Sequence, residues 1–205
     1  MAVMGYNPSL MTGNPRLPVD NVSYDEAEDF CEALNEKFAE RLPEGYEFAL
    51  PSEAQWEFAS RGGRKAEGGA FSGADDSNAT AWHVGNSGGR THLPGEKDEN
   101  PLGIFDMSGN VSEWCRDYCE LGEGLEVLSD AYGEGGRDPV GEDGYCRIRR
   151  GGAWCFAPEA CRSDARAASD EEFKANYVGF RLALVPVQDD DADDDDDDDD
   201  DDGDE

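Results

Sequence analysis

Glycine and proline recur from Gly5 to Pro186 and leave little room for long helices or strands. The sequence holds 25 Gly and 10 Pro in 205 residues. A glycine inside a helix or strand costs conformational entropy, and a proline removes a backbone donor. This pattern favours long ordered loops over regular layers. We find no internal repeat, and a chain of this length is typical of one domain around one core.

Two segments carry helix signals. Residues 23–26 (SYDE) and 52–55 (SEAQ) both fit the capping-box pattern, in which two side chains satisfy free backbone N–H groups at a helix start. Apolar residues at helical spacing extend the first helix to about Glu40. The second is expected to end at residues 62–63 (GG). Residues 179–185 are predicted to form a closing strand.

Negative charge dominates the composition and gathers at the C-terminus. Against 17 Lys and Arg stand 49 Asp and Glu, for a net charge of −32. Residues 189–205 hold 15 of the acidic residues and no basic one, so we expect a disordered poly-Asp tail after a domain at residues 1–188. The domain itself still carries −17, with 13 Arg and only 4 Lys. Such a surface suits concentrated salt and indicates a halophilic source.

The same composition excludes some partners. A surface this acidic repels a phosphate backbone, so we expect no nucleic-acid binding. Because no apolar run approaches the roughly 20 residues needed to cross a bilayer, we expect no membrane span. The N-terminus has neither a basic region nor an apolar signal segment, which favours a cytoplasmic location. The oligomeric state stays open.

Four separated blocks resemble a known family. In chain order they are residues 18–24 (PVDNVSY), 50–58 (LPSEAQWEF) with 61–63 (RGG), 102–114 (LGIFDMSGNVSEW), and 150–154 (RGGAW) followed by 161–162 (CR), Arg166 and 179–181 (GFR). Together the blocks resemble the formylglycine-generating enzyme, or sulfatase-modifying factor, family. The resemblance covers nearly all of residues 15–185 and implies a single α+β domain of the C-type-lectin-like kind, with few regular elements. The family domain normally starts further upstream of residues 7–9, so we expect an N-terminally short domain.

The block at residues 102–114 predicts a calcium site. Calcium takes six to eight oxygen ligands from carboxylates and backbone carbonyls, which a tightly curved loop brings together. Asp106 and Glu113 can supply carboxylates, while Gly109 permits the bend. The carbonyls of Gly109 and Val111 lie between them, and the resemblance implies a structural calcium ion at these positions. The alternative is that Asp106 and Asn110 only make turn hydrogen bonds and Glu113 caps a loop.

The resemblance also implies a copper site. Copper-dependent members of the family use two cysteines separated by four residues, and soft thiolates bind Cu(I) well. Here Cys155 and Cys161 are separated by five residues. Ala153 stands where the family has a serine, and Ser112 stands where an active-site tryptophan is expected. These departures indicate a divergent site.

Two functions follow as alternatives. The first is a metal-dependent oxidoreductase acting on a thiol or peptide substrate, with Cys155 and Cys161 as catalytic residues. Its substrate would be bound by Trp154, Arg162 and Arg166. The second is a non-catalytic binding module that recognises a peptide, protein or small molecule with its loops. The residues it would display are Trp154, Phe156, Glu159, Asp164, Phe173 and Tyr177.

The cysteines leave further alternatives. Six cysteines allow 15 disulfide connectivities. A bridge between Cys115 and Cys161 is one reasonable pairing, since both follow family signature residues, but the reduced state is the default because no signal peptide is visible. Cys31 is expected as a buried free thiol. A zinc site is conceivable from Cys115, Cys119, Cys146 and Cys155. The chain has only His83 and His92, so it cannot build the three-histidine iron site of other family members by itself.

Overall fold

Capping boxes start both of the longer helices, as predicted. The computed structural model describes residues 3–124, 126–128 and 139–187, and the expected tail at residues 189–205 lies outside these ranges. Ser23 caps α1 (Tyr24–Phe38) and accepts from the backbone N–H of Glu26. Ser52 caps α2 (Glu53–Ser60) in the same way through Gln55. A short 3-10 helix, η1 (Ala39–Arg41), continues α1 to about the expected end.

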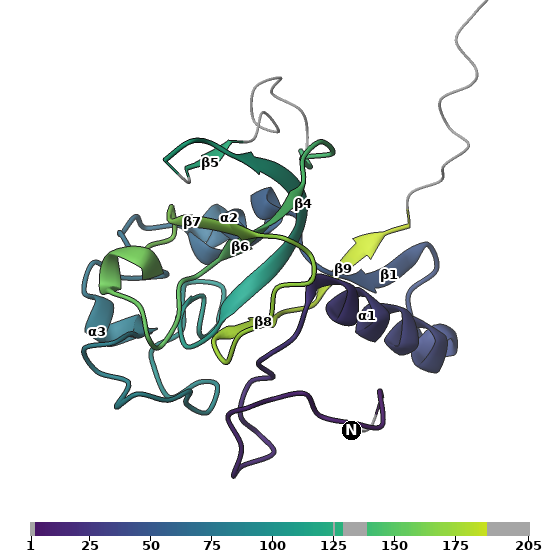
Figure 1. Ribbon diagram of the computed structural model, residues 1–205, viewed down its shortest axis with the longest axis horizontal. Helices are drawn as coiled ribbons and strands as arrows, with labels where there is room; N and C mark the ends of the chain where they lie inside the picture. Colours follow the sequence, from purple (N-terminus) through teal and green to yellow (C-terminus); the bar gives the residue numbers. More distant parts are fainter. Residues whose placement is uncertain (1–2, 125, 129–138, 188–205) are drawn as a thin grey trace, which may run out of the picture.

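The largest sheet brings together segments from the second half of the chain (Figure 1). Its order is β5-β4-β6-β7, and β8 pairs with β4. The β4–β8 pairing is parallel, while the other pairings are antiparallel. The strands are β4 (Ser112–Leu121), β5 (Val127–Leu128), β6 (Cys146–Arg150), β7 (Arg166–Ser169) and β8 (Val178–Phe180).

The remaining described elements are short. Two small sheets pair β1 (Tyr46–Ala49) with β9 (Ala183–Pro186) and β2 (Ala81–Trp82) with β3 (Ser108–Gly109). Single turns of helix are η2 (Gly63–Lys65), α3 (Ser77–Thr80) and η3 (Pro158–Cys161). The predicted α+β organisation with few regular elements and many ordered loops is confirmed. No helix in the described part of the chain is long and apolar enough to cross a bilayer.

The predicted closing strand at residues 179–185 is divided in two. Its first part belongs to β8 and pairs with β4, while its last part belongs to β9 and pairs with β1. Arg181 lies between the two strands and donates to the carboxylate of Glu113. The chain therefore passes from the large sheet to the β1–β9 sheet at Arg181, whose side chain points toward Glu113.

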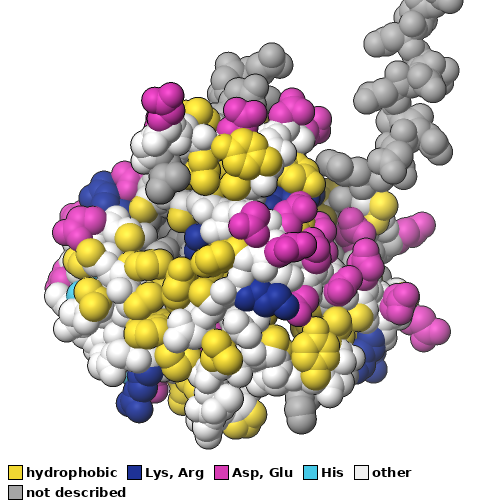
Figure 2. Space-filling view, in the orientation of Figure 1, with side chains coloured by type: hydrophobic (Ala, Val, Ile, Leu, Met, Phe, Trp, Pro, Cys, Tyr) yellow, Lys and Arg dark blue, Asp and Glu magenta, His cyan; other side chains and the backbone are white. Residues whose placement is uncertain are grey.

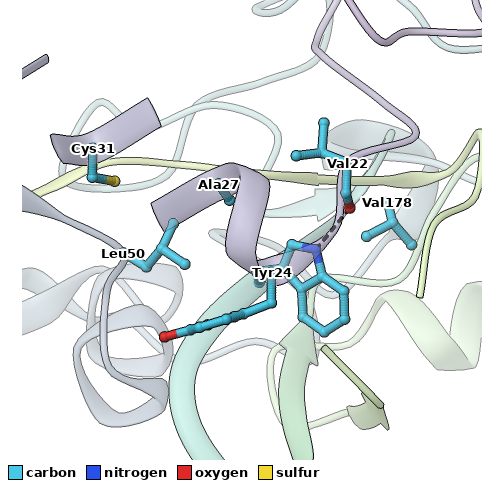
Figure 3. Close-up of a cluster of buried hydrophobic side chains, with 7 residues drawn as sticks. Val22, Tyr24, Ala27, Cys31, Leu50 and Val178 are labelled. Atoms are coloured by element: carbon cyan, nitrogen blue, oxygen red, sulfur yellow. Dashed lines mark hydrogen bonds between the residues drawn. The ribbon is translucent and has the colours of Figure 1, made fainter. Parts of the chain in front are cut away.

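One core cluster joins α1 to the large sheet (Figure 3). Trp114 of β4 is fully buried, and its ring meets that of Tyr24 edge-on at 6.0 Å between centroids. Its indole Nε1 donates to the carbonyl of Val22 at 3.0 Å, the bond drawn dashed in Figure 3. The other members of the cluster are Ala27, Cys31, Leu50 and Val178. This packing fixes α1 against the strands that carry the candidate site.

Candidate functional site

Two adjacent glycines place the predicted cysteine pair. Gly151 and Gly152 follow β6 with φ of 89° and 66°, a left-handed conformation that other residues rarely adopt. A Cβ at Gly152 would lie 2.4 Å from the carbonyl oxygen of Ala160. The close approach folds η3 back over the start of the loop. Cys155 and Cys161 are thereby brought near each other, with Cys161 fully buried and Cys155 partly exposed.

Burial acts on the pKa of both thiols. It is the main cause that raises the pKa of Cys161 to about 12, and the neighbouring Cys155 acts in the same direction. Burial also raises the pKa of Cys155. A preformed copper centre needs thiolates, which cationic neighbours or a helix N-terminus usually stabilise. The predicted copper site stays a prediction.

Ellman's reagent is expected to find one fast thiol in the native protein. Cys155 is partly exposed, whereas the other five cysteines are buried. At pH 8 we expect one thiol to react rapidly and about six after unfolding in guanidinium, because the thiolate must reach the reagent. Cys155→Ser removes the fast reaction, and Cys31→Ser leaves it. Fast reaction of Cys161 in the native protein would contradict the burial of its side chain.

The predicted bridge between Cys115 and Cys161 is wrong, because both are free thiols. Cys115 points from β4 into a second core cluster, in which Cys119 and Cys146 also lie. Cys161 instead contacts the carbonyls of its own loop. Cys31 is a buried free thiol, as predicted. Within the described ranges, no three His, Cys, Asp or Glu side chains converge to hold a metal ion.

The two arginines predicted to bind substrate lie in different surroundings. Arg162 donates Nε and Nη2 to the exposed carboxylate of Asp164 at 2.9 and 3.0 Å. Arg166 donates Nε and Nη2 to the two oxygens of Glu53 at 2.7 and 2.6 Å. Glu53 is fully buried at the start of α2. The structure thus places Arg166 within an internal ion pair and Arg162 at the surface.

A buried ion network behind the cysteine loop was not predicted. Arg150, at the end of β6, is fully enclosed and donates to Glu53 at 3.0 Å and to Glu57 at 2.6 Å. It also donates to the carbonyl of Ser163 at 2.6 Å, which ties the network to the loop after η3. The arginine-rich sequence CRIRR at residues 146–150 is the one signal in the sequence that could have indicated this network. The network explains why several family signature residues are present: they hold α2, β6 and the cysteine loop together.

Three of the predicted calcium residues, Asp106, Gly109 and Val111, lie directly before β4, and the fourth, Glu113, lies at its start. Asp106, Gly109 and Asn110 have φ of 57°, 77° and 65°. A Cβ at Gly109 would lie 2.1 Å from the carbonyl oxygen of Trp82, so only glycine fits there. Val111 is buried directly after the turn. The predicted bend at Gly109 is confirmed, and its immediate cause is the close β2–β3 pairing.

Asp106 and Glu113 are brought together at this turn. Oδ2 of Asp106 accepts from the N–H of Gly95 at 2.9 Å, while its Oδ1 is buried without a hydrogen-bond partner. Burial raises the pKa of Asp106, and the carboxylate of Glu113 raises it further. Glu113 accepts from the indole of Trp56 at 2.7 Å and from the guanidinium of Arg181. The carboxylate oxygens of Asp106 and Glu113 are of the kind that calcium binds, although Arg181 already bonds Glu113.

Two aromatic side chains of the cysteine loop, Trp154 and Phe156, contact the segment at residues 173–177, whose Phe173 and Tyr177 also pack against the core cluster. We call Trp154, Phe156, Phe173 and Tyr177 the aromatic face. All four are partly exposed. The ring of Tyr177 lies 4.9 Å from that of Phe156 and 6.3 Å from that of Phe173, between centroids, and Nε1 of Trp154 donates to Asn176 at 3.1 Å. The predicted display residues Glu159 and Asp164 are exposed nearby in the sequence.

Acidic and apolar side chains are unevenly distributed on the surface. In Figure 2 the acidic side chains crowd the part of the view where Figure 1 shows α1 and β1. Hydrophobic side chains form patches across the centre and left of the same view. The acidic composition therefore leaves apolar surface available for contact.

The fold and the loop geometry define a single C-type-lectin-like α+β domain of the sulfatase-modifying factor type. The sulfatase-modifying factor enzyme 1-like domain matches residues 4–185, and the chain therefore belongs to the formylglycine-generating enzyme, or sulfatase-modifying factor, family. The predicted family and fold class are confirmed.

Similar proteins have different names. The chaperone protein LppX of Paenibacillus barcinonensis is 28% identical, over 87% of this chain and 72% of the relative. The formylglycine-generating enzyme of Streptomyces coelicolor is also 28% identical, but this chain spans only 54% of its length. Among solved structures, Treponema denticola variable protein 1 has a TM-score of 0.75 and 27% identity, covering 91% of this chain and 80% of that protein.

Proposed function

We propose that this protein is a non-catalytic recognition module that binds a peptide segment with its aromatic face. Three features of the site support the proposal. Burial raises the pKa of both thiols, Arg166 bonds Glu53, and four aromatic rings stay partly exposed. Partly exposed aromatic rings that pack on their neighbours provide contact area with little loss of side-chain entropy on binding.

The similar proteins support a peptide or protein ligand. One relative is named a chaperone protein, and a chaperone contacts other polypeptide chains. The structural similarity to Treponema denticola variable protein 1 also supports a recognition function, since variable surfaces are typical of proteins that bind ligands. Ala153, Ser112 and the spacing of the two cysteines depart from the active-site pattern of the family's copper-dependent enzymes. These departures also favour a non-catalytic role.

The test selects ligands from a random hexapeptide phage library on the full chain. Enriched peptides are then measured against Phe156→Ser and Tyr177→Ser, with Cys155→Ser/Cys161→Ser as the matched control. We expect the aromatic variants to lose at least tenfold in affinity and the cysteine variant to bind normally. A failure to enrich any peptide, or enriched peptides indifferent to both aromatic variants, would overturn the proposal.

A second arm tests oxidation directly. A peptide with a Cys-x-Pro-x-Arg target is incubated in air with the full chain, with and without added copper, and its free thiol is counted. We expect the same thiol loss as with Cys155→Ser/Cys161→Ser. If the peptide loses its free thiol faster with the wild-type chain than with the double cysteine variant, the protein is a thiol oxidase instead.

Calcium is expected to stabilise the full chain through Asp106. Its unpaired buried Oδ1 and the adjacent Glu113 are suited to a cation, and a ligand at a hundred times its Kd stabilises by about 2.7 kcal/mol. Calorimetry with and without calcium measures the melting temperature. Asp106→Asn should abolish the rise, whereas Asp164→Asn, at an exposed site, should keep it. A rise that survives Asp106→Asn would assign the effect to other acidic residues.

A further inference from the structure

Three arginines lie along β6, and one of them lacks a carboxylate partner. Arg147 and Arg150 each bond a glutamate. Arg149 is only 6% exposed, and its Nη2 donates to the hydroxyl of Ser169 at 2.8 Å. Among the residues that the structure describes, none accepts a hydrogen bond from its buried Nε and Nη1. Arg149 is therefore a buried cation with two unused donors.

Aromatic rings provide the surroundings of this cation. The Cζ atom of Arg149 lies 5.6 Å from the ring centroid of the buried Trp114 and 5.1 Å from that of the partly exposed Phe173. Burial lowers the pKa of Arg149, and Tyr177 opposes this shift electrostatically. An arginine nevertheless stays charged in a protein. Ring faces offset part of the cost of a buried charge, while a bonded carboxylate offsets much more.

The position of Arg149 links it to the aromatic face. Phe173 belongs to that face and its ring lies over the guanidinium, while the ring of Tyr177 lies 6.3 Å from that of Phe173 between centroids. Tyr177 in turn contacts Phe156. The guanidinium of Arg149 thus lies next to Phe173, a ring that the proposed function assigns to binding.

We propose that Arg149 is the anion-binding centre of the aromatic face, and that the ligand presents a carboxylate attached to an apolar group. This inference rests on the proposed recognition function and specifies the chemistry of its ligand. The partly exposed ring of Phe173 or Tyr177 turns aside, the carboxylate accepts from Nε or Nη1, and the rings cover the apolar part. A charge-assisted hydrogen bond in this apolar setting then gives the specificity.

The first test measures the free protein. Arg149→Met keeps an apolar side chain of similar length and removes the uncompensated charge, a change that is often neutral or stabilising. We expect its melting temperature to equal or exceed that of the wild type. Arg150→Met, which leaves two glutamates without that partner, should melt much lower. If Arg149→Met falls as far as Arg150→Met, Arg149 is a structural residue and the proposal is wrong.

The second test uses benzoate and neutral benzamide as probes, followed by tryptophan fluorescence and melting temperature. The wild-type chain should bind benzoate at least tenfold more tightly than benzamide. Arg149→Met should lose this preference, while Arg41→Met, at an exposed residue of η1, should keep it. Equal binding of the two probes by the wild type, or a preference that survives in Arg149→Met, would overturn the proposal.

The two proposals fail in different ways. If selected hexapeptides need Phe156 and Tyr177 but bind Arg149→Met normally, the recognition function stands and the anion site is wrong. If no hexapeptide is selected but benzoate binding depends on Arg149, the anion site stands and peptide recognition is wrong.

Discussion

Arg150→Met is expected to lower the free energy of unfolding by about 3–5 kcal/mol, the usual cost of removing one partner from a buried ion pair. The side chains of Arg150 and Glu53 are both fully enclosed. Glu53 keeps its bonds to Arg166, but Glu57 loses its partly buried bond to Arg150, and the carbonyl of Ser163 loses a donor. The loop that carries the cysteines would loosen at the same time.

Guanidinium unfolding at fixed salt measures this loss. The matched control is Arg61→Met, which removes an exposed arginine from the same Glu57. Because exposed ion pairs contribute about 0–1 kcal/mol, the control should change little. Equal losses in the two variants would show that the buried network does not stabilise the fold.

Trp114→Ala is expected to cost about 3–5 kcal/mol, as for other large buried aromatic residues. The ring is fully buried between α1 and the large sheet and contacts Tyr24. Truncation removes that contact, opens a cavity and leaves the carbonyl of Val22 without its indole donor. The expected result is a large fall in stability with loss of the fixed position of α1.

Urea unfolding followed by circular dichroism measures the effect. Trp114→Phe fills most of the space and removes only the indole donor and the second ring, so its loss should be clearly smaller. An equal loss for Phe and Ala would mean that the hydrogen bond to Val22, and not packing, dominates at this position.

The helices could be predicted because their signals are local. A capping box consists of residues three apart, and Ser23 with Glu26 and Ser52 with Gln55 form the bonds that the pattern predicts. The bend at Gly109 is local in the same sense. Family signature blocks supplied the rest of the fold prediction, since they mark positions along the whole domain.

The roles of the arginines could not be predicted, because their partners are distant in the chain. Arg166 carries the same side chain whether it binds a substrate or Glu53, which lies 113 residues away. The strand β6 is fully buried although three of its five residues are arginines. Periodicity cannot predict burial that depends on glutamates and aromatic rings contributed by other elements. Arg149 was missed for the same reason.

The dissociation constant of one enriched hexapeptide for three chains tests the recognition function most directly. The chains are the wild type, Cys155→Ser/Cys161→Ser and Phe156→Ser, and fluorescence titration at fixed salt measures each constant. We predict equal affinity for the wild type and the cysteine variant, and at least tenfold weaker binding by Phe156→Ser. Loss of binding in the cysteine variant, with Phe156→Ser unaffected, would contradict recognition by the aromatic face.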